Sequence, residues 1–168
     1  MADETAIPRQ DEQSDAPPIV INAQYTKDLS FEAPTAPAIY GAMQQNAPDV
    51  QVGVNVDFSE FENSVFEVVL KVEARCTVGE EVAFLLELEY GGLFSLNVDE
   101  EIKGPMLLIE CPRLLFPFAR NILADVSRDG GFPPLMLGPV DFAGLYQGEL
   151  ERQGAESGDA PSSPVNLA

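Results

Sequence analysis

The chain contains no histidine and no tryptophan, and it has only two cysteines among its 168 residues. The lack of histidine removes the commonest general base and the commonest metal ligand. Cys76 and Cys111 do not have the spacing of a metal site, so we expect two reduced structural thiols of the kind found in cytoplasmic proteins. Neither a phosphate-binding glycine loop nor a nucleophile motif is present. We therefore predict that the protein is not an enzyme and binds no cofactor or metal.

Basic residues are also scarce, since nine Lys and Arg stand against 28 Asp and Glu for a net charge of −19. This charge would repel nucleic-acid phosphates and anionic lipids and would attract basic partners. The N-terminus lacks the basic and apolar stretches of a signal peptide, and no apolar run approaches the roughly 20 residues that cross a bilayer. We expect a cytoplasmic protein that neither binds nucleic acid nor inserts into a membrane.

Composition divides the chain into a body and two tails. Residues 1–18 carry five acids and three prolines, and residues 151–168 are rich in Gly, Ser, Pro and acids. Both compositions are typical of disordered segments because they offer little apolar surface to bury. Residues 19–150 are then a single domain, long enough to enclose a hydrophobic core.

Alternating apolar residues predict four strands, at about Ile19–Phe31, Val50–Phe58, Ser64–Val78 and Glu81–Tyr90. Alternation of this length is typical of antiparallel strands with one buried face and one face in water. In the first strand the apolar set is Ile19, Ile21, Ala23, Tyr25, Leu29 and Phe31. Gly91-Gly92 should bend the end of the fourth strand.

The connection between the third and fourth strands can be predicted from the same alternation. A two-residue turn at Gly79-Glu80 would place Val78 opposite Glu81. Pairing Val78 with Val82, across a three-residue loop or a bulge, keeps both apolar sets on one face. We expect the odd-length loop.

After the strands the apolar period becomes helical. Asn97 or Asp99 can cap a helix whose first turn contains Glu100-Glu101, which suits the positive end of the helix dipole. Gly104-Pro105 should break this helix, and two more prolines leave little room for an unbroken helix before Phe118.

Two further helical segments are separated by an apolar, proline-rich loop. Phe118–Arg128 carries an apolar stripe and ends at Gly130, a suitable position for a left-handed cap. The loop Gly131–Pro139 leads to Asp141, which can cap a short final helix. One side of that helix carries Phe142, Leu145, Tyr146 and Leu150. Strands followed by helices indicate an α+β fold.

Acidic residues gather on the predicted open face of the sheet. They are Asp28, Glu32, Glu67, Glu73, Glu81, Glu87 and Glu89, with Leu85 exposed among them. This set is either an ordinary solvated surface or a docking face, because an apolar anchor inside a charged rim fits a basic partner with a small hydrophobic knob. A carboxylate-only hydrolase is a third interpretation, but an open sheet face does not desolvate its acids.

Three segments resemble the SecB family of bacterial protein-export chaperones, in particular its alphaproteobacterial members. They are Tyr25–Pro34, Gly130–Leu135 and Pro139–Phe142, and the resemblance extends from Ile19 to Leu150. It implies a four-stranded antiparallel sheet followed by helices, assembled as a homotetramer that is a dimer of dimers. In the family, first strands pair between subunits and the helices lie between two eight-stranded sheets. The long first strand predicted here would otherwise leave an exposed edge.

The resemblance also implies a function. SecB proteins are ATP-independent chaperones that hold unfolded precursor proteins and deliver them to the SecA motor for export. The family's docking residues for the zinc-binding tail of SecA correspond to Asp28, Glu32, Leu85 and Glu87. Its client-binding groove corresponds to Val50, Val52, Val54, Phe84, Leu86, Leu145, Tyr146 and Leu150. From periodicity alone, the valines, Phe84 and Leu86 are more often core residues than members of a binding groove.

Two points remain open from the sequence. Relatives often carry an aromatic residue just before the second strand, where this chain has Asn46 and Ala47, so the aromatic end of the groove could be reduced. A SecB-like chaperone dedicated to one partner, such as an antitoxin, is the alternative to general export.

Overall fold

The computed structural model describes residues 16–158, with side chains up to residue 155. The elements are β1 (Ile19–Glu32), α1 (Ile39–Ala42), β2 (Pro48–Glu60), β3 (Val65–Val78), β4 (Glu81–Leu96), α2 (Glu100–Pro105), the π-helical turn η1 (Met106–Glu110), α3 (Cys111–Asp129) and α4 (Phe142–Gly158). The four strands form one antiparallel sheet in the order β1-β4-β3-β2. The α+β fold predicted from the sequence is therefore confirmed.

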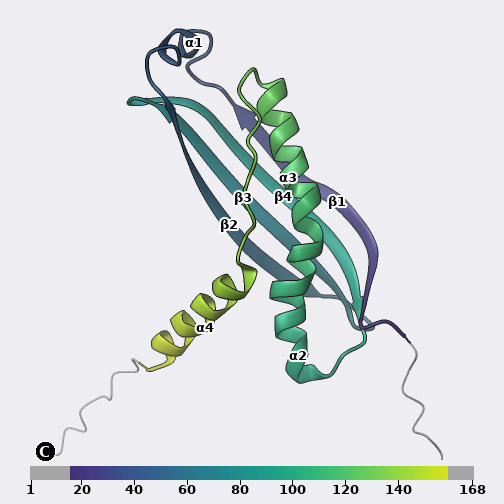
Figure 1. The fold of residues 1–168 in the computed structure, drawn as a ribbon. Helices are drawn as coiled ribbons and strands as arrows, with labels where there is room; N and C mark the ends of the chain where they lie inside the picture. The colour runs from purple at the N-terminus through teal and green to yellow at the C-terminus, as the bar shows by residue number, and fades with distance from the viewer. Residues whose placement is uncertain (1–15, 159–168) are drawn as a thin grey trace, which may run out of the picture.

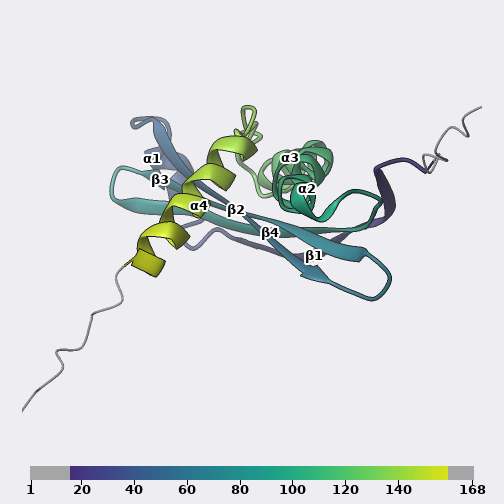
Figure 2. The same ribbon diagram turned by 90° about the horizontal axis from the view of Figure 1, so that it is seen from below.

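All the long helices lie on one face of the sheet, which we call the inner face (Figures 1 and 2). α3 crosses this face, and a loop then runs back over the sheet beside α3 to α4 (Figure 1). Within residues 16–158, no helix lies on the opposite, outer face (Figure 2). No helix in the described part of the chain is long and apolar enough to span a membrane.

The core lies between the inner face and α3. Its largest fully buried side chains are Phe94, Phe142, Ile39, Leu70, Leu86, Leu88, Leu115, Leu123, Val68, Val72, Pro112 and Cys111. Cys76 and Cys111 are both free and buried in this core. Burial raises the pKa of both thiols, that of Cys111 to about 12, so both remain protonated and unreactive near neutral pH.

The predicted length of the loop between β3 and β4 is wrong, although the apolar residues of the two strands do share one face, which was the reason for the prediction. Gly79-Glu80 forms the two-residue turn, with Gly79 at a φ of 62° and Val78 paired with Glu81. An unpaired residue, Ala83, then shifts the register so that Cys76 pairs with Phe84. This bulge, rather than a longer loop, brings the apolar sets of both strands to the inner face.

Two bulges in β1 also change which face part of this strand presents. The register shifts at Asn22 and Lys27, so residues between them alternate out of phase with the rest of the strand. Tyr25, predicted to be buried, consequently lies on the outer face opposite Gly91. A Cβ atom on Gly91 would come within 2.7 Å of the Tyr25 ring, so this glycine makes room for the ring. β4 continues through Gly91-Gly92 to Leu96, so the strand does not end at these glycines.

The predicted helix break at Gly104-Pro105 is also wrong, because the chain stays helical from Glu100 to Asp129. As predicted, Glu100-Glu101 form the first turn of the helix. Asp99 occupies the N-cap position, but its side chain makes no capping hydrogen bond. The wider turn η1 lies between Pro105 and Pro112. A π turn moves backbone carbonyls away from a following proline ring, which relieves the clash that normally breaks a helix.

The left-handed cap of α3 is at Gly131, one residue after the predicted Gly130. Gly131 has a φ of 89°, and its N–H donates to Arg128 O while Phe132 N–H donates to Ser127 O. These two bonds make a Schellman cap. The cap points the chain back over the sheet, where Phe132 packs against Phe84 with ring centroids 5.0 Å apart.

The final helix begins as predicted, because the Asp141 carboxylate accepts a hydrogen bond from Gly144 N–H at 3.0 Å. α4 then continues past Leu150 to Gly158, into the segment expected to be a disordered tail. Glu149 supports this extension through an ion pair with Arg152 at 2.9 Å and a hydrogen bond from Gln153 at 3.3 Å. The remaining predicted tail residues, 1–15 and 159–168, lie outside the described residues.

Candidate functional site

The four predicted docking residues come together on the outer face of β1 and β4. The register pairs Glu32 with Leu85, and Ser30 with Glu87, while Asp28 lies opposite Glu89. Side chains directly opposite each other in antiparallel strands lie about 5 Å apart. The three acids are exposed and Leu85 is half-buried among them, so the structure places an apolar side chain within an acidic rim.

A shallow hollow of about 420 Å³ adjoins Leu85 on this face. Its polar lining comes from three strands and includes Gln51, Glu73, Arg75 and Glu87. The hollow could receive a small side chain beside Leu85 while carboxylates contact basic groups around it.

Not all of the acidic residues predicted for the outer face lie on it. Glu67, Glu73 and Glu89 do lie on it, but Glu81 pairs with the inner-face residue Val78 and is wrongly assigned to the outer face. The bulge at Ala83 accounts for the error, because it reverses the alternation near the turn.

Two lysines neutralise part of this face. Glu67 accepts hydrogen bonds from Lys27 at 2.8 Å and from the Tyr25 hydroxyl at 2.5 Å, and these groups hold the pKa of Glu67 below its usual value. Lys71 lies 2.7 Å from Asp57 and 3.5 Å from Glu89, and these acids, chiefly Asp57, raise the pKa of Lys71. Within the part of the chain that the structure describes, no salt bridge involves Asp28, Glu32 or Glu87. The carboxylates around Leu85 therefore remain available to an external cation.

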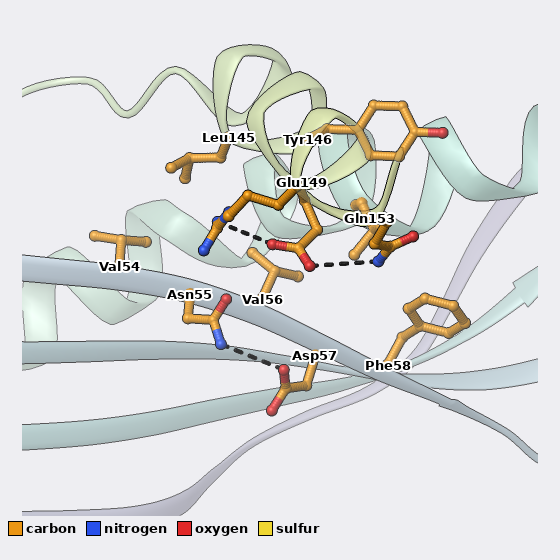
Figure 3. Close-up of a pocket in the computed structure, with 11 residues that line it drawn as sticks. Val54, Asn55, Val56, Asp57, Phe58, Leu145, Tyr146, Glu149 and Gln153 are labelled. Carbon is orange, nitrogen blue, oxygen red and sulfur yellow. Dashed lines mark hydrogen bonds and ion pairs between the residues drawn. The ribbon is translucent and has the colours of Figure 1, made fainter. Parts of the chain in front are cut away.

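A second feature, a groove of about 840 Å³, lies between β2 and α4. Its lining is Val54, Asn55, Val56, Asp57, Phe58, Leu108, Leu145, Tyr146, Glu149, Arg152 and Gln153. Val54 and Val56 point from β2 toward α4, as Figure 3 shows. β2 is an edge strand, so its inner face is only partly covered and stays accessible beside α4.

The structure brings some of the predicted groove residues together and separates others. Val54, Leu145 and Tyr146 line the groove. Val50 and Val52 are exposed farther along the same face of β2. The last of the predicted groove residues, Leu150, is exposed on α4 but does not line the groove.

Phe84 and Leu86 are core residues in this chain, with 3% and 0% of their surface exposed. Phe84 packs against Phe31 and Phe132 at centroid distances of 5.6 and 5.0 Å. In this conformation neither Phe84 nor Leu86 presents surface to a client, and their assignment to a binding groove stays a prediction.

Sequence reasoning missed the polar lining residues and three apolar ones: Val56, Phe58 and Leu108. The alternation of β2 contained the signal for Val56 and Phe58, because both share the face of Val54. Leu108 belongs to η1, whose continuous helical path the prolines obscured.

Comparison with known proteins gives the family. Residues 12–153 match the family model described as preprotein translocase subunit SecB. The chain is 49% identical over 167 residues to the protein-export protein SecB of Maricaulis maris, covering 99% of this chain and 95% of that protein. It is 53% identical over 146 residues to the protein of the same name from a Bradyrhizobium species, covering 85% and 90%. This chain belongs to the SecB family of protein-export chaperones.

A solved structure supports the same fold for this SecB-family chain. A SecB-like chaperone of Mycobacterium tuberculosis, in complex with a peptide from an antitoxin, matches with a TM-score of 0.63 and 15% identity. The match covers 73% of this chain and 91% of that protein. At this identity the likeness concerns the fold.

The structure gives a physical reason for one SecB-like segment, Gly130–Leu135. A Cβ atom on Gly130 would lie 2.3 Å from the Phe31 ring, and one on Gly131 would lie 2.6 Å from the Tyr40 hydroxyl. The two glycines thus let the end of α3 pack directly against β1 and the segment after it. The following Phe132 completes this aromatic cluster.

The geometry offers two candidate binding surfaces. Among the side chains of residues 16–155, no group of three or more Cys, Asp and Glu residues is arranged to hold a metal ion. The outer-face carboxylates around Leu85 are open to water. What the described residues present is a groove with a mixed apolar and polar lining on one side of the sheet and an acidic, partly apolar surface on the other.

Proposed function

We propose that this SecB-family protein is an ATP-independent cytoplasmic chaperone that holds unfolded precursor proteins and delivers them to SecA. The observation that supports delivery most directly is the grouping of Asp28, Glu32, Leu85 and Glu87 on the outer face. Its unpaired acids and its half-buried leucine suit a basic tail with a small apolar knob. No catalytic step is part of this proposal.

We propose that the client lies along the inner face of β2 and the adjoining face of α4. The exposed residues there are Val50, Val52, Leu145 and Leu150, and they continue the groove that contains Val54 and Tyr146. Each apolar client side chain buried there would contribute about 1.5–3 kcal/mol. Phe84 and Leu86 form the packed layer beneath, and they would contact a client only if the loop over them moved.

We further propose that the protein assembles as a homotetramer. Apolar side chains stay exposed on the inner side of β1 and on α3, namely Ile21, Leu29, Leu114 and Phe118. β1 is also an edge strand, and a strand of this length is normally paired or protected. Pairing of β1 between subunits and helix packing between dimers would cover both features.

SecA binding gives the first test of this function. Asp28→Ala combined with Glu87→Ala should weaken binding to SecA and leave client holding nearly unchanged, and wild-type binding should weaken as salt rises. The matched control is Asp49→Ala with Asp57→Ala, which removes the same charge from the same face at β2. Surface plasmon resonance with immobilised SecA separates the two variants, because a charge-only effect would weaken both equally. Binding indifferent to salt and to both acids would refute the assigned face.

The alternative of one dedicated client can be tested by a pull-down from cells. A general export chaperone should recover many precursors, whereas a dedicated chaperone should recover one dominant client. The full-length similarity to export proteins favours general export, and the antitoxin-bound relative shares the fold at only 15% identity.

A further inference from the structure

The acidic outer face contains an arginine beside its apolar residue. Arg75, on β3, is exposed and lies directly opposite Leu85 on β4 and Gln51 on β2. Side chains that face each other in antiparallel strands lie about 5 Å apart. A permanently charged guanidinium therefore lies beside the leucine of the proposed docking surface, and it is not one of the docking residues predicted from the sequence.

The neighbouring row of the same face places two carboxylates against each other. Glu73 on β3 lies directly opposite Glu87 on β4, and both are exposed. Like charges in this arrangement repel each other and destabilise a sheet, so a cation bound between them would be favourable. Arg75 and Glu73 are two residues apart on one strand, which separates their Cα atoms by about 7 Å. A place that favours an anion thus adjoins a place that favours a cation.

Among the side chains of residues 16–155, no salt bridge or hydrogen bond involves Arg75. The two lysines of the same face differ in this respect, because Lys27 lies 2.8 Å from Glu67 and Lys71 lies 2.7 Å from Asp57. The planar fork of N–H donors on an arginine fits a carboxylate, and the two parallel hydrogen bonds add strength and specificity to the ion pair. Arg75 is therefore available to an external carboxylate.

Arg75, Leu85 and both glutamates line one hollow, the shallow one of about 420 Å³ described above. The hollow is open toward β2, where Gly53 lies opposite Glu73 and a Cβ atom would meet no atom within 4 Å. A single partner segment in this hollow would contact an apolar side chain, a cation and two anions within a few residues of extended chain.

We propose that Arg75 is a specificity-determining residue of the docking surface, and that it binds the carboxylate of an Asp or Glu side chain in the basic docking tail of SecA. In a tail segment extended along β3, this acid would be two positions from the base that lies between Glu73 and Glu87. The proposal rests on the SecA docking proposed above and adds an acid to the chemistry required of the partner. The alternative is that Arg75 only weakens the negative potential of the face, and removing its charge would then strengthen the binding of a basic tail.

The test compares the binding of full-length wild type, Arg75→Gln, Arg75→Lys and Lys71→Gln to immobilised SecA by surface plasmon resonance. Arg75→Gln should weaken binding about three- to tenfold, because it leaves the partner's carboxylate beside two glutamates without a cation. Arg75→Lys should have an intermediate affinity, since an ammonium group keeps the charge and loses the fork. The matched control, Lys71→Gln, removes the same charge from the same strand and face, and it should bind the basic tail at least as tightly as wild type does. Circular dichroism and light scattering check that fold and mass are unchanged.

A charge swap then identifies the acid of the partner. Each Asp and Glu of the SecA tail is replaced in turn by Lys, and one of these SecA variants should bind Arg75→Glu more tightly than wild-type SecA does. The assigned pairing is wrong, while the docking face stands, if Arg75→Gln binds as tightly as wild type or more tightly, or if Arg75→Gln and Lys71→Gln weaken binding equally. It is also wrong if no tail variant restores binding to Arg75→Glu. If the wild-type chain does not bind SecA, the proposed function itself fails, and the pairing with it.

Discussion

At the scale of single residues, the space filled by neighbouring side chains determines which residue type fits at several positions of this SecB-family protein. Gly91 leaves space for the Tyr25 ring, and Gly130 leaves space for the Phe31 ring. Neither glycine has a positive φ, so neither is required by its own backbone conformation. The requirement comes from a strand or a helix end approaching an aromatic ring, and it is therefore steric.

Gly130→Ala should destabilise the fold by about 1–3 kcal/mol, the usual cost of forcing atoms into a packed site. The added methyl group would overlap the Phe31 ring, which is held on its other side by Phe84. Urea unfolding followed by circular dichroism measures the change. Gly53→Ala is the matched control, because a Cβ there meets no atom within 4 Å. Equal unfolding midpoints for the two variants would contradict the steric explanation.

Tyr25 should make the free energy of unfolding depend on pH under alkaline conditions. Burial, and then the Glu67 carboxylate, raises the pKa of Tyr25 from 10.0 to about 12. The unfolded chain loses this proton first, so the contribution is fully present below pH 10 and is lost as pH rises toward 12. Tyr25→Phe should make the fall in unfolding free energy between pH 10 and 12 less steep, with Tyr146→Phe as the control for loss of a hydroxyl. A slope identical to wild type in Tyr25→Phe would show that this tyrosine is not responsible.

At the scale of secondary-structure elements, bulges determine which face of the sheet a side chain lies on, and caps determine the direction in which the chain leaves a helix. The two β1 bulges turn Tyr25 outward, and the β4 bulge keeps Phe84 inward. At the end of α3, the buried Ser127 hydroxyl donates to backbone carbonyls of α3 and accepts a hydrogen bond from Leu135 N–H at 2.8 Å. Ser127 thereby ties the loop that leads to α4 onto α3.

Ser127→Ala should cost about 1–3 kcal/mol, since it leaves the Leu135 N–H without its acceptor. The effect should be local, so hydrogen exchange at the Leu135 amide should accelerate more than exchange at core amides of β3. Ser95→Ala removes an exposed hydroxyl, bonded to Asn22 at 2.8 Å, and should change little. Unchanged exchange at Leu135 in Ser127→Ala would show that the loop is held by other contacts.

Phe84→Ser should destabilise the fold rather than act selectively on client binding, because the ring is buried among Phe31 and Phe132. Replacing a buried phenylalanine by a small polar residue typically costs about 3–5 kcal/mol. Val52→Ser, at an exposed position, should keep stability within about 1 kcal/mol while reducing client holding. Thermal unfolding together with client titration distinguishes the two. A stable Phe84→Ser protein with weakened holding would mean that Phe84 is accessible to clients in solution.

The element predictions show what a single sequence could provide. Alternation located all four strands, and capping chemistry located Asp141, because these signals are local. The two bulges of β1 were not predicted, and the bulge of β4 was only the alternative to a longer loop, since an unpaired residue is selected by fit across strands far apart in sequence, as with Tyr25 over Gly91. The unbroken helix through Pro105 depends on a π turn, and no short sequence pattern predicts such a turn. The groove was predicted only in part. Exposed Val50 and buried Phe84 have the same periodicity, and what buries Phe84 is packing against Phe31 and Phe132, which are far from it in sequence.

At the scale of the whole molecule, the proposed tetramer has consequences for affinity. Four groove contacts give a gross of roughly 6–12 kcal/mol, and ordering the client costs a similar amount. One short segment should therefore bind weakly, while one long client could engage several grooves at once.

A client of more than about a hundred residues should bind far more tightly than any 15-residue piece of it, because later contacts form at high effective concentration. A nested series of client lengths, titrated against the wild-type protein, measures this. Light scattering in the same buffer should give about four times the chain mass of 18.2 kDa. A monomer, or equal affinity for the shortest and longest clients, would contradict the multivalent mechanism.

The alternation of β4 has one more consequence. Leu85 and Leu86 are adjacent in the chain and point to opposite sides of a single layer, the first toward the proposed motor surface and the second toward the core beneath the client path. Motor and cargo would therefore bind to opposite faces of the sheet and would be able to occupy this protein at the same time. Transfer of a precursor would then require no prior release of that precursor into solution. The precursor would begin to leave its groove while the chaperone is still bound to the export motor.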